Sequence, residues 1–471
     1  MFGFSRKQQS VLHLTWVAFF LTFMAWFNMA PFNTTILKTT GLTIQQIDIL
    51  MICNVALTIP ARILIGTFVD RFGPRLVFSA LLLYSSAVCF YFSQASAFSE
   101  FLVSRLLMGV SGAGFVVGIK MIAEWFPPEK MGTAQGIYAG WGNFGAAAAA
   151  FSLPLIAALF PQDTGWRVAT AVSGGLCLLW SGVYFIFSRE VPSRGENFKV
   201  GLINSIPVTS RKDLVLQILL MIPIYGSVLA VVWKLYGHPL FLLSPGILWI
   251  LLTGLITLFV FSMLKCIRSN LPHLLHPVPG EHYYEFRQIF ILSLVYALTF
   301  GSNLAVISMF PEFLESTFDL SVIAAGVLGS SFAFMNLITR PCGGWLSDIF
   351  GRRRTLFILV LGSMAGYLAM SRITSAWPLW SVLALAVTCS VFLQAGSGAC
   401  FAMVPLIRKD LTGKMAGLAG AYGNVGAVLF LTILSFVEEQ TFFEFIGWYA
   451  CLVLSSLVFL QSFKTLHVSY K

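Results

Sequence analysis

Long apolar runs alternate with short polar loops along nearly the whole chain. A helix that crosses a bilayer needs about 20 apolar residues, and the pattern predicts such helices in three groups. Six spans are predicted at 12–34, 44–67, 75–95, 99–125, 133–158 and 166–187, two at 213–234 and 240–266, and six at 287–310, 320–347, 354–372, 377–406, 413–437 and 443–463. We therefore expect an all-α polytopic membrane protein with about 14 spans.

Composition supports lipid as the main solvent. Of the 471 residues, 58% are hydrophobic and 10% are charged. In soluble domains, roughly a quarter of the residues are charged. The net charge of +10 would suggest nucleic acid in a soluble protein, but the positive residues lie in short loops, so no nucleic-acid partner is predicted. The eight Cys are scattered singly without a CxxC pair, and no metal, cofactor or enzyme motif is predicted.

The loop charges predict which side faces the cytoplasm. Lys and Arg gather in one set of loops, as at Arg71, Arg75 and Arg352, whereas the opposite loops carry acidic residues such as Glu100 and Glu438. Cytoplasmic loops of membrane proteins carry the excess of Lys and Arg. Both termini are therefore expected on the cytoplasmic side of a cytoplasmic (inner) membrane.

The chain contains an internal repeat. A Gly-rich loop sequence with Asp70 recurs around Asp348, at an offset of 348 − 70 = 278, and a Gly-Asn sequence at Asn143 recurs at Asn424, at 424 − 143 = 281. We expect an N-terminal six-helix half (1–190), a linker with two extra transmembrane helices (191–286) and a C-terminal six-helix half (287–471). Two six-helix halves with a site between them are a transporter architecture.

The repeated loop resembles the signature of the major facilitator superfamily between its second and third helices. Each Asp ends a helix near the cytoplasmic face, and the following glycine permits a tight turn. A second stretch, from Arg105 to Gly114, resembles the superfamily's fourth-helix motif. The expected gating and motif residues are Asp70, Arg71, Arg75, Asp348, Arg352 and Arg105. These motifs indicate the superfamily and leave the cargo open.

Two arginines carry information about the cargo. Arg62 and Arg340 each precede their loop Asp by eight residues, which places each roughly 12 Å into the membrane. A midplane Arg costs at least about 2.5–3.5 kcal/mol on insertion scales, and no Asp or Glu is expected at matching depth. The pair therefore predicts an incoming anion. The planar guanidinium donates two parallel hydrogen bonds, which suits a planar oxyanion.

Further polar and aromatic residues are expected near the same depth. Amide groups at midplane can donate to an anion, and aromatic faces can cover it, although such residues also serve as ordinary interhelical contacts or core. The candidates on glycine-rich helices or beside them are Asn143, Asn424, Tyr296, Phe300, Phe115 and Phe401.

The two stretches around Asn143 and Asn424 resemble the paired nitrate signatures of the nitrate/nitrite porter family. The resemblance covers roughly residues 1–190 and 287–465. It implies that Arg62 and Arg340 clamp the anion, that Asn143 and Tyr296 hydrogen-bond it, and that Phe115 and Phe401 cover its flat face. This family usually has twelve helices, and the pair at 213–266 has no assigned counterpart.

Lys120 and Glu124 stand out in the fourth span. Their i,i+4 spacing allows an ion pair on one helix face, which predicts a structural role, with coupling or gating as the alternative.

The resemblance implies transport of nitrate or nitrite by alternating access, and nitrate/nitrite exchange is favoured because two fixed charges make an empty carrier costly to close. The alternatives are proton-coupled nitrate symport, a major facilitator for another small organic solute, and an anion sensor. The expected partners are a small inorganic anion and membrane lipid. The oligomeric state stays open, with a monomer as the simplest assumption.

Overall fold

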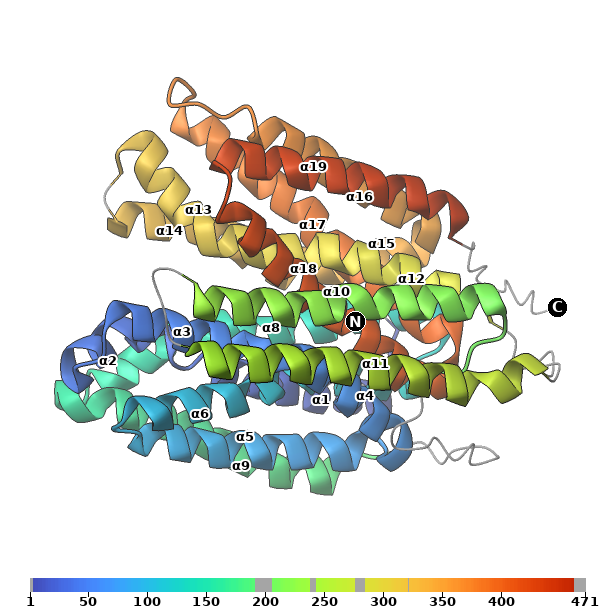
Figure 1. Cartoon of the computed structure of the whole chain (residues 1–471), viewed down its shortest axis with the longest axis horizontal. Coiled ribbons are helices and arrows are strands. Elements are labelled where there is room, and N and C mark those ends of the chain that lie inside the picture. Colours follow the sequence, from blue (N-terminus) through green and yellow to red (C-terminus); the bar gives the residue numbers. More distant parts are fainter. Residues whose placement is uncertain (1–2, 191–205, 238–242, 276–283, 321, 461–471) are drawn as a thin grey trace. The chain divides into compact units, whose positions relative to one another are not determined.

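The computed structural model describes residues 3–190, 206–237, 243–275, 284–320 and 322–460, and these ranges contain helices and no strands (Figure 1). The helices of the first half and the linker are α1 (Arg6–Trp26), α2 (Asn33–Thr40), α3 (Ile44–Ala56), α4 (Thr58–Phe72), α5 (Pro74–Gln94), α6 (Phe98–Met108), α7 (Gly114–Trp125), α8 (Met131–Ala157), α9 (Gln162–Phe187), α10 (Arg211–Tyr236) and α11 (Pro245–Leu275). Those of the second half are α12 (Phe286–Tyr296), α13 (Ser302–Phe318), α14 (Val322–Phe334), α15 (Asn336–Phe350), α16 (Arg352–Met370), α17 (Leu379–Ile407), α18 (Thr412–Leu434) and α19 (Glu439–Ser456).

The predicted all-α membrane architecture is confirmed. In the described ranges, 11 helical segments are long and apolar enough to cross a membrane. The other three predicted spans correspond to α8, to α14 followed by α15, and to α16. The ends differ from the expectation by several residues, most at α11, which extends to Leu275 instead of 266.

Several predicted single spans are broken in the middle. A turn residue, Leu57, separates α3 from α4, and Met335 separates α14 from α15. A 3-10 segment (η2, Gly109–Ala113) joins α6 to α7, and a π-helical segment (η5, Ala297–Gly301) joins α12 to α13. Hydropathy does not report such breaks, because a local change in backbone geometry leaves the apolar run intact.

The described chain forms two compact units. Unit 1 comprises residues 1–125, 141–284 and 410–421, and unit 2 comprises 126–140, 285–409 and 422–471. Each unit therefore takes the first turns of one helix from the opposite half of the sequence, α18 in unit 1 and α8 in unit 2.

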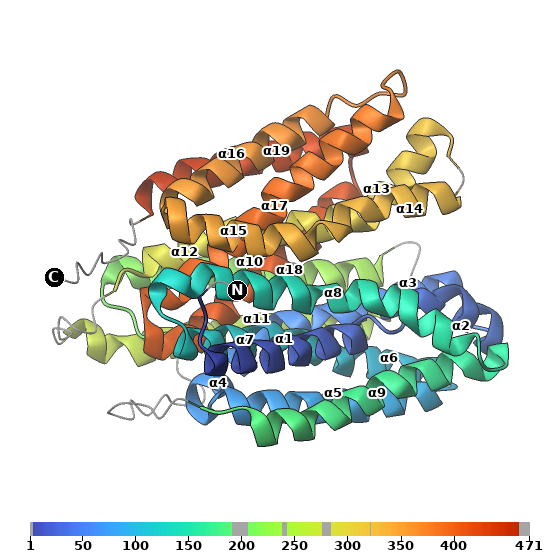
Figure 2. The same cartoon turned by 180° about the vertical axis from the view of Figure 1, so that it is seen from behind.

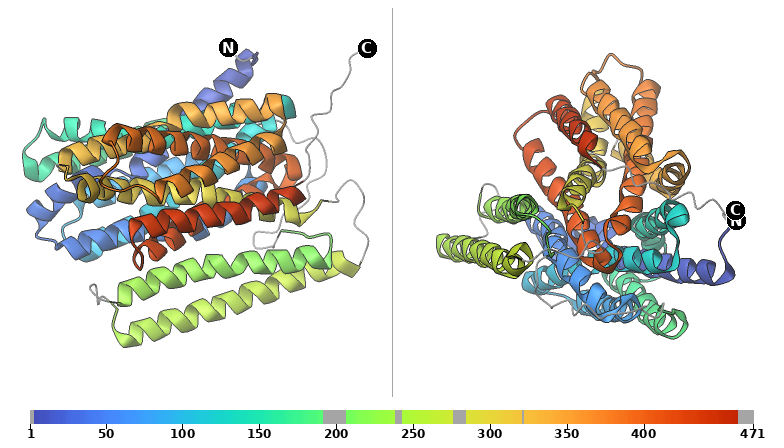
Figure 3. Two further views of the ribbon diagram at one scale, coloured as in Figure 1. Left: turned by 90° about the horizontal axis from the view of Figure 1, so that it is seen from above. Right: turned by 90° about the vertical axis from the view of Figure 1, so that its right-hand side faces the viewer.

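In unit 1, α5 and α9 lie side by side along most of their length, with α1 packed against both (Figures 1 and 2). Aromatic side chains fill the core, among them Phe92, Phe101 and Trp166, which are at most 1% exposed. The linker helices α10 and α11 form an antiparallel pair whose α10 also contacts α3 (Figure 3). In the most apolar stretch of α11, no residue is buried within the described protein, as suits a lipid-facing helix.

In unit 2, α17 packs against α15 and α16, and α16 packs against α19 (Figure 2). The repeated loop adopts the tight turn that the sequence predicts. Gly73 follows α4 and Gly351 follows α15, and both have positive φ, 81° and 89°. Only glycine adopts this backbone conformation at little cost, so the next helix can begin at once.

Candidate functional site: two buried arginine clusters

Arg62 is the fifth residue of α4 and Arg340 is the fifth residue of α15, each directly after a helix break. The breaks share the repeat offset of the arginines, since 335 − 57 = 278 and 340 − 62 = 278. Pro60 explains the first break, because its ring excludes the carbonyl four residues before it. Both arginines therefore extend from the first turns of a half-helix, where the helix dipole is positive and favours anions.

The first cluster lies in unit 1 around Arg62, which is 1% exposed. Its Nε donates to the Gly112 carbonyl of η2 at 3.3 Å, and its Nη1 donates to the Gly420 carbonyl of α18 at 2.5 Å. The guanidinium carbon lies 5.5 Å from the ring centroid of Phe115, a cation–π distance. Both of these hydrogen-bond partners are backbone carbonyls, which orient the guanidinium.

The second cluster lies in unit 2 around Arg340, which is 0% exposed. Its Nη2 donates to the Tyr296 hydroxyl at 3.1 Å, and its guanidinium carbon lies 5.4 Å from the Phe300 centroid. Tyr296 and Phe300 stack in parallel at 5.0 Å, and Phe401 meets Tyr296 edge-on at 4.4 Å. Phe300 belongs to the π-helical segment η5, a geometry that is frequent at functional sites.

The predicted residues thus divide between the two units. The structure brings Arg62 together with Phe115, and Arg340 together with Tyr296, Phe300 and Phe401. Asn143 belongs to unit 1 and Asn424 to unit 2.

The two asparagines are both buried, at 7% exposure for Asn143 and 0% for Asn424. Within the described ranges, neither the Oδ1 nor the Nδ2 of Asn424 has a hydrogen-bond partner. Buried polar groups normally have one, so Asn424 is available to a ligand.

Asp70, at the end of α4, caps a helix from the opposite half of the sequence. Its carboxylate accepts from the backbone N–H groups of Gly413 and Lys414, at 2.8 and 2.7 Å, at the start of α18. Lys120 Nζ lies 3.1 Å from Asp70 Oδ1. The expected partner of Lys120 was Glu124 on its own helix, and the structure adds this ion pair with the loop Asp.

Asp348 repeats this arrangement in unit 2. It accepts from the N–H groups of Gly132 and Thr133, at 2.9 and 2.7 Å, at the start of α8, and also from the Thr133 hydroxyl at 2.9 Å. Arg352, one turn further on, donates to it at 2.8 Å. Both Asp side chains are thus anions at helix N-termini, where the dipole and the open N–H groups favour them.

The remaining motif arginines differ in their surroundings. Arg71 is exposed, and Arg75 donates through Nε to the Phe185 carbonyl at 2.7 Å. Arg105 is 0% exposed and donates through Nη1 to Asn28 Oδ1 at 3.1 Å.

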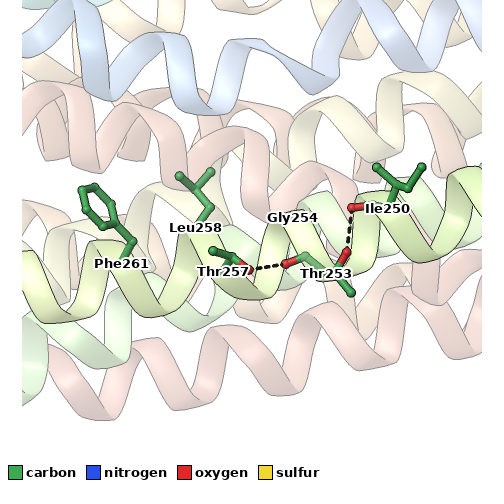
Figure 4. A pocket seen from close by; sticks show the side chains of 6 residues that line it. All are labelled: Ile250, Thr253, Gly254, Thr257, Leu258 and Phe261. Atoms are coloured by element: carbon green, nitrogen blue, oxygen red, sulfur yellow. Dashed lines mark hydrogen bonds between the residues drawn. The ribbon is translucent and has the colours of Figure 1, made fainter.

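A shallow apolar groove on α11 is unrelated to these clusters. All six residues that line it belong to the exposed face of α11, as Figure 4 shows. Its Thr253 and Thr257 hydroxyls donate to carbonyls of their own helix, so these donors are already used.

Some contacts of the candidate residues had no signal in the sequence. The carbonyl partners of Arg62, at Gly112 and Gly420, depend on backbone geometry and not on side-chain type. The link from Lys120 to Asp70 joins residues 50 positions apart, and no periodicity connects them.

Comparison with known proteins defines the class. Residues 15–282 and 292–466 match the sequence model of the Major Facilitator Superfamily, so the chain belongs to this superfamily. Its fold is similar to that of the human organic anion transporter MFSD10 (TM-score 0.64, 14% identity, 96% of this chain and 100% of that one). The proton:xylose symporter XylE is similar to the same degree (TM-score 0.64, 14% identity, 97% and 96%).

Relatives with higher sequence identity define the family within the superfamily. The chain is 42% identical over 461 residues to the nitrate/nitrite transporter NrtP of Nostoc punctiforme, covering 95% of this chain and 91% of that protein. It is 40% identical over 468 residues to NrtP of Picosynechococcus sp., covering 94% and 87%. The probable nitrate/nitrite antiporter NarK1 of Thermus thermophilus is 25% identical, over 96% and 90%. Within the superfamily, the chain belongs to the nitrate/nitrite porter family, as its paired signatures predict.

Proposed function

We propose that this protein is a secondary transporter that carries nitrate and nitrite across the cytoplasmic membrane by alternating access. Relatives at 40 and 42% identity over nearly the full length bear the name of nitrate/nitrite transporters. The observation in the molecule that carries the proposal is the pair of fully buried arginines at equivalent positions of repeated half-helices.

The chemistry of the two clusters suits a small planar oxyanion. Arg62 and Arg340 each supply a guanidinium fork, and each has an aromatic face nearby, Phe115 or Phe300. A guanidinium fork donates charge-assisted hydrogen bonds to an oxyanion, and an aromatic ring beside it can cover the anion's flat face. Asn143, Asn424 and Tyr296 add neutral donors, and Phe401 holds Tyr296 edge-on.

A sugar or drug carrier fits these residues less well. A sugar needs many neutral hydrogen-bonding groups around it, whereas the arginines offer fixed positive charge, which an anion compensates. We therefore favour an inorganic anion over an organic solute.

The charges of Arg62 and Arg340 also favour exchange of nitrate for nitrite as the mode of transport. An empty carrier holds two buried guanidinium groups without their anion, and desolvated charge of this kind is costly. Bound nitrate or nitrite lowers that cost and permits the conformational change. Asp70 and Asp348, which cap α18 and α8, are the gating contacts that this change must break and re-form.

The topology proposed here has both termini in the cytoplasm, six-helix halves at 1–190 and 287–471, and the α10–α11 pair between them in the sequence. A monomer suffices for this scheme. Labelling of single cysteines from outside, with residues of the acidic loops accessible and residues of the basic loops protected, tests the orientation.

Uptake into proteoliposomes tests the function. Vesicles preloaded with nitrite should accumulate labelled nitrate many times faster than empty vesicles, and vesicles without protein should show neither flux. Equal rates with and without internal nitrite, together with concentrative uptake driven by a pH gradient alone, would establish proton symport instead. Flux of a sugar or a carboxylate without nitrate flux would refute the proposal altogether.

A further inference from the structure

A third arginine shares the properties of the two in the clusters. Arg62, Arg105 and Arg340 are the charged residues among the largest fully buried side chains. Each has an aromatic ring under its guanidinium, and for Arg105 this is Phe92, with 3.7 Å from the guanidinium carbon to the ring centroid. This burial distinguishes Arg105 from Arg71, which is exposed, and from Arg75, which is partly exposed.

The partners of Arg105 are neutral throughout the described ranges. Its Nη1 donates to Asn28 Oδ1 at 3.1 Å, and no described carboxylate forms an ion pair with it. Asn28 is held in place because its Nδ2 donates to the Ser173 hydroxyl at 3.1 Å. Asn28 lies at the break after α1, Ser173 in α9 and Phe92 in α5. Three parts of unit 1 thus orient the guanidinium, and none of them compensates its charge.

The unsatisfied donors of Arg105 form one edge of the guanidinium. Nε and Nη2 are buried and have no hydrogen-bond partner among the described residues. These two nitrogens carry the parallel N–H groups that bind two oxygens of a carboxylate or another planar oxyanion. Buried donors without partners are rare in proteins, and a buried charge normally has a counter-charge.

We propose that Arg105, with Asn28 and Phe92, forms a second binding site for a small monovalent anion in unit 1, separate from the Arg62 cluster. Nitrate and nitrite fit this site because they are planar, carry one charge and are weakly hydrated, so they enter an apolar core more readily than phosphate or sulfate. Arg105 precedes Gly112, the carbonyl partner of Arg62, by seven residues, which is roughly 10 Å along the fourth span. The choice of nitrate as the occupant rests on the proposed function, whereas the presence of an anion does not.

Anomalous diffraction from crystals of the full chain grown with bromide tests the site directly, without a variant. A bromide peak in hydrogen-bond contact with Nε and Nη2 of Arg105 is the expected result. Ordered water alone at this edge would overturn the inference.

Nitrate titration of the purified protein, followed by its melting temperature, provides the second test. In the double variant Arg62→Lys/Arg340→Lys the principal site is disabled, and a saturable nitrate response should remain. Adding Arg105→Gln to the double variant should raise the half-saturating nitrate concentration at least tenfold. Adding Arg372→Gln, which removes an exposed arginine, should leave that concentration unchanged. A melting curve without nitrate reports on folding, and Arg105→Lys serves as the charge-retaining variant if Arg105→Gln does not fold.

The outcomes separate this inference from the proposed function. If the double variant has no saturable response, or keeps it after Arg105→Gln, the second site is refuted while the clamp by Arg62 and Arg340 stands. If the wild type and the double variant respond alike and Arg105→Gln abolishes the response, the clamp is refuted and the site at Arg105 stands.

Discussion

Arg62 and Arg340 occupy the same position of two repeated helices, yet the two units hold them by different means. Unit 1 holds Arg62 through backbone carbonyls of Gly112 and Gly420. Unit 2 holds Arg340 through the Tyr296 hydroxyl, within a set of packed aromatic rings. The two repeats therefore share the arginine and its place in the helix but differ in what orients it, so substitutions should affect the two units unequally.

The largest effect is expected at the two equivalent arginines, Arg62 and Arg340. Arg62→Lys and Arg340→Lys each keep one positive charge but lose the planar fork. Each lost charge-assisted bond is worth about 1.5–3 kcal/mol, so nitrate affinity should fall roughly tenfold to over a hundredfold in either variant. Equilibrium binding to the purified, folded variants measures this. Near-normal affinity in either one would defeat the idea that both units contribute a clamp.

The second-largest effect is expected at the helix caps, where substitution of Asp70 and of Asp348 should lower stability by unequal amounts. Asp→Asn at either position removes a charged acceptor and should lower stability by about 1.5–3 kcal/mol. Asp348→Asn should be the more damaging, because Asp348 also accepts from the Thr133 hydroxyl. Thr133→Val should lower the stability of an otherwise unchanged chain by about 1 kcal/mol. Melting temperatures of the three variants compare them, and equal losses for the two Asn variants would contradict the assignment.

The glycines beside the two clusters should respond unequally to a methyl group. A Cβ at Gly423 would lie 2.7 Å from ring atoms of both Phe300 and Tyr296, whereas a Cβ at Gly420 would lie 3.4 Å from Arg62 Cδ. Overpacking of this kind costs about 1–3 kcal/mol, so Gly423→Ala should weaken nitrate binding and Gly420→Ala much less. Binding isotherms of both variants decide this, and a greater loss in Gly420→Ala would reverse the comparison.

Removal of the Tyr296 hydroxyl should have a smaller effect, which concerns unit 2 alone. Tyr296→Phe keeps the ring that stacks on Phe300 and removes the acceptor of Arg340. The loss should be about 0.5–1.5 kcal/mol, or less than about twelvefold in affinity. The matched variant in unit 1 is Phe115→Leu, which removes the ring beside Arg62 and leaves the two carbonyl bonds of Arg62. Unchanged affinity in Tyr296→Phe would show that the hydroxyl does not orient Arg340.

The smallest effect is expected at α10 and α11, which contain none of the clustered arginines. Replacing the pair by a polar linker should leave nitrate affinity within about twofold of the wild type, since the main contact of the pair with another helix, in the described ranges, is that of α10 with α3. Loss of nitrate binding in a well-folded deletion variant would show that the pair takes part in transport.

Much of the fold was predictable because it depends on local chemistry. Apolar runs separated by charged loops specify spanning helices, and the repeat from Gly66 to Arg75 specifies the tight turn that Gly73 makes with positive φ. The same reasoning found Arg62 and Arg340, because an arginine eight residues inside a span is visible from its distance to the loop. The relatives confirm the family that the paired signatures indicate.

Other features were beyond the sequence because they depend on which atoms meet in space. Acceptors such as the Gly112 and Gly420 carbonyls exist in every peptide unit, so composition cannot single them out. Lys120 was expected to pair with Glu124 by helical spacing, and its ion pair with Asp70 depends on two helices that lie side by side. The sequence by itself determined how far each arginine lies from its loop Asp, because that distance follows from counting residues. Only the tertiary structure decided what each charge touches, as with the open edge of Arg105, because hydrogen bonds are satisfied or left open over ångström distances between distant segments.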